Sequence, residues 1–109
     1  MVYNGDMEFI ETPIFTKWIT QTISDDSYQE LQKLLIENPE YGKVIPGGNG
    51  IRKIRWNLEN RGKRGSARII YYYKVIADQI FMLFAYSKKE QGDLTSKQKK
   101  LLGEYARGL

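Results

Sequence analysis

Three segments that read as β-strands each carry basic side chains. Lys53 and Arg55 lie two residues apart, so their side chains share one face of a strand. Arg68 opens the next segment, and Lys88 and Lys89 close the third. In a meander of three strands these positions can converge on one end and one face of the sheet. The five residues are therefore candidates for a site that binds a polyanion.

The stretch around these residues is also strongly basic. Ile51 to Arg68 contains seven basic residues and one acidic residue, Glu59. Arginine has a rigid fork of donors that suits phosphate, which favours a binding role over a solvated hairpin without a ligand. Four further basic residues become candidates for contacts with RNA or DNA phosphate: Arg52, Arg61, Lys63 and Arg64.

The run of tyrosines offers a candidate for base stacking. Tyr72 alternates onto the face of Arg68, where an aromatic ring could stack on a nucleobase. Tyr71 and Tyr73 alternate onto the other face, and we expect them to pack in the core.

The amino-acid composition excludes several kinds of catalytic and metal site. The 109 residues include 17 Lys and Arg, 13 Asp and Glu, no histidine and no cysteine, for a net charge of +4. Disulfides, cysteine nucleophiles, Cys/His zinc sites, Ser-His-Asp triads and histidine bases are excluded. The charge is unevenly placed: residues 1–49 hold three basic and eight acidic residues (net −5), and residues 50–109 hold fourteen and five (net +9).

The length fits one domain, residues 1–109. The longest apolar run, Ile80 to Tyr86, is seven residues, and a membrane span needs about 20. The first residues lack a basic region followed by an apolar stretch, so we expect no signal peptide, no membrane association and a cytoplasmic location.

Periodicity predicts an α+β fold. In the N-terminal half, Met7 to Glu11 is a weak strand, Thr12-Pro13 starts a helix over Pro13 to Thr22, and a second helix ends at Asn38-Pro39. Either Ser27, in a capping box with Glu30, or Ser24 caps the second helix. The two helices should form a hairpin that packs on the sheet.

The C-terminal half supplies most of the sheet. We expect strands over Ile51 to Leu58, Ser66 to Val75 and Ile80 to Tyr86, and the last should be central because it is apolar throughout. Thr95 and Gln98 resemble a capping box that starts a short C-terminal helix. The prediction is a mostly antiparallel, four-stranded sheet that carries the helical hairpin.

The ordered set of these segments resembles the RelE-like toxins of bacterial type II toxin–antitoxin systems, in particular the HigB branch. The resemblance extends over nearly the whole chain, although no single motif is diagnostic. It is carried by Gly50-Ile51-Arg52-Lys53-Ile54-Arg55, Gly62 to Tyr72, Leu83 to Glu90, and Asp93-Leu94 before the last helix.

The resemblance implies a RelE-like α+β fold and a ribosome-dependent endoribonuclease that cuts mRNA and so inhibits translation. It also implies a cognate antitoxin with a helix-turn-helix domain, through which alone the toxin would reach operator DNA. The family pattern places catalytic groups at Lys53, Arg55, Arg68, Lys88 and Lys89. Several members carry a tyrosine shortly after the basic pair; here Glu90 to Thr95 contains none, so that role falls to Lys53 or to no residue.

The mechanism must then use lysine and arginine. Attack by the RNA 2′-OH needs a base, stabilisation of phosphorane charge and a proton for the 5′-oxygen, and we expect no metal or other cofactor. Arg55 and Arg68, assisted by Arg64, would stabilise the charge. Lys53 would be the base if crowding by Arg52, Arg55 and Arg68 disfavours its protonated form, and Lys88 or Lys89 would protonate the leaving oxygen or bind phosphate.

Two other functions remain open. A non-catalytic relative that binds RNA or the ribosome is supported by the missing tyrosine. A DNA-binding regulator is less favoured, because the N-terminal helices are acidic and the basic residues lie on strands rather than on a recognition helix.

Overall fold

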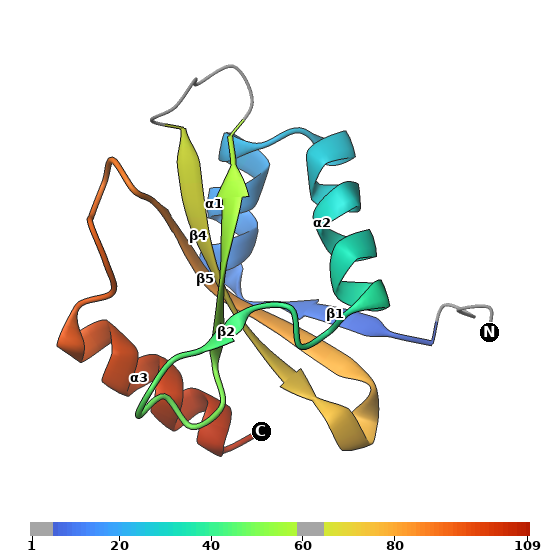
Figure 1. The fold of residues 1–109 in the computed structure, drawn as a ribbon, viewed down its shortest axis with the longest axis vertical. Helices are drawn as coiled ribbons and strands as arrows, with labels where there is room; N and C mark the ends of the chain where they lie inside the picture. Colours follow the sequence, from blue (N-terminus) through green and yellow to red (C-terminus); the bar gives the residue numbers. More distant parts are fainter. Residues whose placement is uncertain (1–5, 59–64) are drawn as a thin grey trace.

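One mixed sheet organises the protein (Figure 1). The computed structural model describes residues 6–58 and 65–109. The strands run in the order β1-β5-β4-β3-β2. Their bounds are β1 Glu8–Glu11, β2 Lys43–Val44, β3 Arg52–Asn57, β4 Ser66–Lys74 and β5 Gln79–Ser87. β1 is parallel to β5, and the other pairs are antiparallel.

The helices begin at the capping residues that the sequence indicates. α1 (Pro13–Thr22) begins after Thr12, whose hydroxyl accepts the Phe15 N–H at 3.2 Å. α2 (Asp25–Glu37) begins after Ser24, whose hydroxyl accepts the Ser27 N–H, so the cap is Ser24 and not Ser27. α3 (Ser96–Arg107) begins after Thr95 with the expected capping box to Gln98. A short 3₁₀ turn, η2 (Val75–Ala77), joins β4 to β5.

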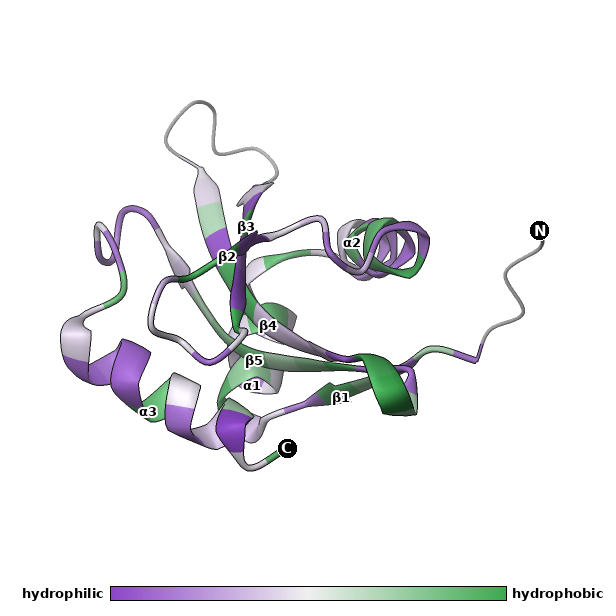
Figure 2. Cartoon of the chain, turned by 60° about the horizontal axis from the view of Figure 1, so that its bottom comes forward, coloured by the Kyte–Doolittle hydropathy of each residue, from purple (hydrophilic) through white to green (hydrophobic). Residues whose placement is uncertain are grey.

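Apolar side chains fill both faces of the central strands. Under α1 and α2 the buried cluster is Phe15, Ile19, Leu31, Leu35, Ile54, Leu58, Ala67, Ile69, Tyr71, Ile80, Met82 and Ala85. Under α3 and the loop after β2 it is Ile45, Ile51, Ile70, Phe81, Leu83, Tyr86 and Ala106. β5 contributes to both, which confirms that the apolar strand is covered on each side. Figure 2 shows α3 beside the loop after β2, away from α2.

The sheet has five strands and not the expected four. The additional strand, β2, pairs only Lys43 with Lys53 and Val44 with Arg52. Two residues are too few to produce a detectable alternation, which is why the sequence predicts a loop there. The remaining expectations are confirmed: an α+β fold, an N-terminal helical hairpin, a mostly antiparallel sheet and a C-terminal helix.

A buried tyrosine fixes the connection between α2 and β2. Tyr71 is fully buried; its hydroxyl donates to the Pro39 carbonyl at 2.8 Å and accepts the Gly42 N–H at 2.9 Å. Gly42 must be small, because a Cβ there would lie 2.8 Å from Cε1 of Tyr71. From β3, Arg52 Nη1 donates to the carbonyls of Glu40 and Gly42 at 3.1 and 2.8 Å. These bonds hold β2 against β3.

Across the described ranges, no helix combines the length and apolar character needed to cross a bilayer.

Tyr71→Phe should destabilise the fold without changing its shape. The ring would keep its packing, but the Gly42 N–H would lose its acceptor and the Pro39 carbonyl its donor. A loss of about 1–3 kcal/mol in the free energy of unfolding is expected in urea titrations. The exposed Tyr105 is the matched control, and Tyr105→Phe should change stability by less than about 0.5 kcal/mol. Equal effects of the two variants would contradict the anchoring role.

Stability should fall in alkali. Burial is the main cause that raises the pKa of Tyr28, Tyr71 and Tyr86 above the ordinary value for tyrosine. In the unfolded chain these hydroxyls ionise at about pH 10, while in the folded chain they stay protonated at that pH. Their contribution is therefore fully present below about pH 10 and is lost as the pH rises toward the folded-state pKa. Urea unfolding at about pH 8 and about pH 11 should show this loss, and a smaller one in Tyr71→Phe.

Candidate functional site

Two arginines lie directly opposite each other on one face of the sheet. The register pairs Arg55 of β3 with Arg68 of β4, and Arg68 with Tyr86 of β5. The row therefore crosses three strands on the face that α3 partly covers. Lys53 lies two residues before Arg55 and shares this face. Like charges placed directly opposite destabilise a sheet, so this row is suited to an anion that neutralises it.

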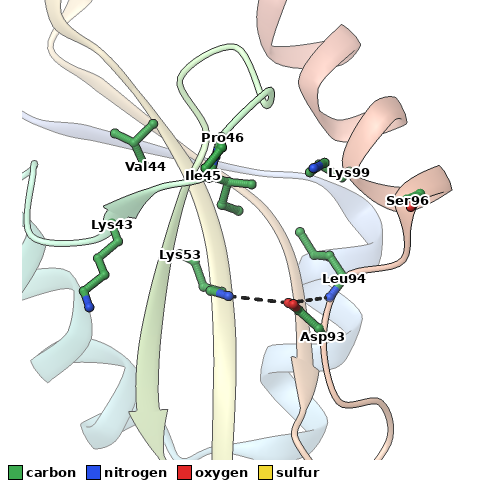
Figure 3. Close-up of a pocket in the computed structure, with 9 residues that line it drawn as sticks. All are labelled: Lys43, Val44, Ile45, Pro46, Lys53, Asp93, Leu94, Ser96 and Lys99. Carbon is green, nitrogen blue, oxygen red and sulfur yellow. Dashed lines mark hydrogen bonds and ion pairs between the residues drawn. The ribbon is translucent and has the colours of Figure 1, made fainter.

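Lys53 and Tyr86 meet at the carboxylate of Asp93, which follows β5. Figure 3 shows the pair of Lys53 and Asp93. Lys53 Nζ lies 3.4 Å from Oδ1 of Asp93, and the Tyr86 hydroxyl donates to the same oxygen at 3.4 Å. The Leu94 N–H donates to it at 2.8 Å. That backbone N–H, and then Lys53, lower the pKa of Asp93. Burial raises the pKa of Tyr86, with Asp93 adding to the effect and Arg68 opposing it, so Tyr86 stays a protonated donor near neutral pH.

The loop that carries Asp93 is tied down at several points. Lys88 Nζ donates to the Gly92 carbonyl at 3.1 Å. Gln91 Nε2 donates to the Asp93 carbonyl and to Oε1 of Gln98, each at 2.8 Å. Because Gln98 is also part of the capping box of α3, the loop and the helix start are one hydrogen-bonded unit.

Two neighbouring hollows lie along β3. One, of about 330 Å³, is shown in Figure 3, and the other has about 390 Å³. They share Lys43 and Lys53. Five cationic residues line the pair, namely Lys43, Lys53, Arg55, Arg68 and Lys99, and Asp93 is the acidic residue among the described lining. The exposed ring of Tyr41 borders the larger hollow.

The catalytic candidates fall into two groups. Lys53, Arg55 and Arg68 come together at the hollows. Arg68 is half-buried, and its Nη1 donates to Oγ of Ser66 at 3.1 Å, which draws the side chain back along β4. Lys88 and Lys89 are exposed just beyond β5, and Lys88 is held to β4 by its backbone N–H, which donates to the Ser66 carbonyl at 2.9 Å. Neither lysine lines the described hollows.

The candidates for RNA contact are separated. Arg52 points to the face that α2 covers, where it bonds the carbonyls of Glu40 and Gly42, so the structure assigns it to holding the fold instead. Tyr72 packs on the second apolar cluster and against Gly50, with Ile70 between it and Arg68 along β4. We therefore leave both out of the site. Arg61, Lys63 and Arg64 lie outside the described residues.

Sequence reasoning missed Lys43, Lys99 and Asp93 as members of the site. Lys43 lies in the acidic half of the sequence and reaches the site only through the two-residue strand β2. Lys99 lies on α3, and Asp93 in the preceding turn, so their positions depend on how that helix packs. Tyr86 ends the apolar run Ile80 to Tyr86, which predicts a buried strand residue and no role at the site. The one feature of the sequence that could have indicated Asp93 is the run Asp93-Leu94-Thr95, which leads into the capping box of α3.

The arrangement can bind phosphates and stabilise negative charge on them. Arginine forks at the centre and lysines on either side form a positive surface that widens into the two hollows. Within residues 6–58 and 65–109, no three residues among His, Cys, Asp and Glu gather as a set that could hold a metal ion. The chemistry available from these side chains is charge stabilisation and proton transfer by Lys, Tyr and Asp.

Comparison with known proteins bears on the family and the fold of the chain. The family model described as RelE toxin of the RelE/RelB toxin–antitoxin system matches residues 7–109. A solved structure of a mutant of the E. coli toxin RelE in the free state superposes with a TM-score of 0.57 at 13% identity. The match covers 80% of this chain and 88% of that chain. At this identity the likeness establishes a shared fold.

Removal of one site arginine should weaken the salt dependence of polyanion binding. With a single-stranded RNA homopolymer, Arg55→Gln should reduce the slope of log K against log salt by about 0.7, the value for one lost phosphate contact. Lys17→Gln is the control, because Lys17 is exposed on α1, which covers the other face of the sheet. Fluorescence anisotropy at several salt concentrations measures the slopes. Identical slopes for the two variants would place the phosphate contacts elsewhere.

Proposed function

The chain belongs to the RelE toxin family of toxin–antitoxin systems, and from this membership we propose that it is a ribosome-dependent endoribonuclease that cuts mRNA. Cleavage would inhibit translation until an antitoxin neutralises the toxin. The observation that carries the proposal is the row of Arg55 and Arg68 beside Lys53, at two hollows lined mainly by cations. Such a site matches the phosphodiester backbone of RNA.

The chemistry divides between charge and proton transfer. The 2′-oxygen of the RNA attacks the adjacent phosphorus and passes its proton to solvent water. The bond from phosphorus to the 5′-oxygen breaks, and that oxygen takes up a proton. The products carry a 2′,3′-cyclic phosphate and a 5′-hydroxyl. Arg55 and Arg68 stabilise the extra negative charge on the phosphorane, because both forks lie on one face at the same level of the sheet.

The proton-transfer groups are Lys53 and the residues around it. The sequence predicts three arginines around Lys53. Arg52 is not one of them, because it points to the opposite face of the sheet. The recorded partner of the Lys53 ammonium is a carboxylate instead. Lys53 therefore suits donation of the proton to the leaving oxygen or binding of the phosphate, beside the Tyr86 hydroxyl. Lys88 and Lys89 would bind RNA phosphates farther along the strand.

Tyr86 also bears on the missing tyrosine. The position after the basic pair where several relatives have a tyrosine is occupied here by the stretch that ends in Thr95, the N-cap of α3. The Tyr86 hydroxyl reaches the same carboxylate as Lys53 from β5. This contact supports Tyr86 as the residue that supplies a tyrosine hydroxyl to the proposed site.

The further proposals follow from family membership and from the sequence resemblance. The chain acts as a single domain over residues 1–109 in the cytoplasm, in the HigB branch of the family. Its partners are the ribosome with its mRNA and a cognate antitoxin whose helix-turn-helix domain binds operator DNA on behalf of the complex.

Mapping of cleavage sites by primer extension tests the proposal. The wild-type protein should cut mRNA in the presence of ribosomes and leave the same mRNA intact without them. Arg68→Lys should lower the cleavage rate about tenfold or more, because a point charge replaces a two-pronged donor. Lys17→Gln, on the other face, should cut at the wild-type rate. In cells, expression should arrest growth, and co-expression of the neighbouring antitoxin gene should restore it.

Two results would contradict the proposal. Wild-type protein that sediments with ribosomes but produces no cuts would identify a non-catalytic ribosome-binding relative. Full activity of Lys53→Ala and Arg68→Ala would show that the site lies elsewhere.

A further inference from the structure

A carboxylate in a site for a polyanion needs an explanation. Asp93 lines the smaller hollow beside Lys43, Lys53 and Lys99. Its charge repels the phosphates that these lysines would attract, so it lowers affinity for RNA. Its side chain is 73% exposed, and an exposed ion pair contributes little to stability. The ion pair with Lys53 therefore adds little to stability, while the charge opposes the binding of phosphates.

The contacts of Asp93 point to a positioning role. One oxygen, Oδ1, lies 3.4 Å from Lys53 Nζ and 3.4 Å from the Tyr86 hydroxyl. These groups come from β3 and β5, on either side of the strand that carries Arg68. Lysine has a flexible stem with many rotamers, so a fixed partner selects where its ammonium lies. Asp93 thus links two side-chain donors, the Lys53 ammonium and the Tyr86 hydroxyl, that come from different strands.

The carboxylate is itself fixed. Its backbone carbonyl accepts from Gln91, and Gln91 in turn bonds Gln98 in the first turn of α3. The Leu94 N–H donates to Oδ1 at 2.8 Å and sets the orientation of the carboxylate. α3 is docked in place because Asn49 Nδ2 donates to the Gly103 carbonyl at 2.9 Å. The position of α3 therefore sets the position of Asp93, and Asp93 in turn holds the Lys53 ammonium.

We propose that Asp93 is a positioning residue of the cleavage site, which holds the Lys53 ammonium and the Tyr86 hydroxyl in line with the Arg55–Arg68 row. The proposal rests on the proposed endoribonuclease function. Asp93 costs affinity for RNA and increases the rate at which bound RNA is cut.

The test is single-turnover cleavage of ribosome-bound mRNA by Asp93→Asn. Asparagine keeps the size of the side chain and still accepts the Leu94 N–H, but it carries no charge to hold Lys53. We expect a cleavage rate at saturation about tenfold to a hundredfold lower, with affinity for the ribosome–mRNA complex unchanged or tighter. Asp93→Glu, which restores the charge, should recover part of the rate. Glu104→Gln removes an exposed acidic charge from α3 and should cut like the wild type.

A double-mutant cycle identifies the residue through which Asp93 acts. In a Lys53→Gln background, Asp93→Asn should lower the rate several-fold less than it does in the wild type, because the ammonium is already gone and only the Tyr86 hydroxyl remains to be positioned. A purely structural role in the turn before α3 would give the same loss in both backgrounds, and that result would overturn the proposal. So would wild-type cleavage by Asp93→Asn. Thermal unfolding of each variant separates loss of the fold from loss of positioning.

A readout that does not depend on cleavage separates this inference from the proposed function. Acylation of Lys53, quantified by mass spectrometry against Lys17 in the same chain, should be faster in Asp93→Asn, since the ion pair shields the amine. Wild-type protein that fails to cut mRNA would defeat the proposed function and, with it, the role in cleavage. Unchanged labelling of Lys53 would overturn the positioning contact whether or not the wild type cuts.

Discussion

The register between β3 and β4 is the constraint on which the rest of the site depends. It sets Arg55 opposite Arg68, an arrangement of like charges that costs stability unless an anion neutralises it. A shift of β3 by one residue would turn Arg55 to the other face and expose Ile54, which lies opposite Ile69 of β4 in the first apolar cluster. The apolar cluster that contains these isoleucines therefore fixes the position of the charged row.

The sheet can carry this repulsive row because each of its faces is buried over most of its length. α1 and α2 cover one face, and α3 with the loop after β2 covers part of the other. The contact between α3 and that loop is close, since a Cβ on Gly103 would lie 3.1 Å from the Gly48 carbonyl oxygen. The uncovered part of the second face is where Lys53, Arg55 and Arg68 meet. One layer arrangement thus provides both the stability and the open cationic surface.

The charges of the site come from separate parts of the chain. Lys43 enters through β2, Lys53 and Arg55 through β3, Arg68 through β4, and Asp93 and Lys99 through the turn and helix after β5. Tyr71 and Arg52 hold the first of these segments, and the bonds of Gln91 and Gln98 hold the last. Because separate elements supply and hold these charges, the fold can keep a positive centre while Asp93 fixes the position of Lys53.

The sequence by itself determined the helices, their caps at Thr12 and Thr95, the long strands and the cationic character of Lys53, Arg55 and Arg68. These follow from local rules of spacing, hydrogen bonding and side-chain alternation. Four features required tertiary structure: the choice of Ser24 over Ser27 as cap, the strand β2, the turn of Arg52 toward α2 and the partial burial of Tyr72. So did the meeting of Lys53, Tyr86 and Asp93, because residues 40 positions apart come within 3.4 Å only after β4, β5 and α3 have packed.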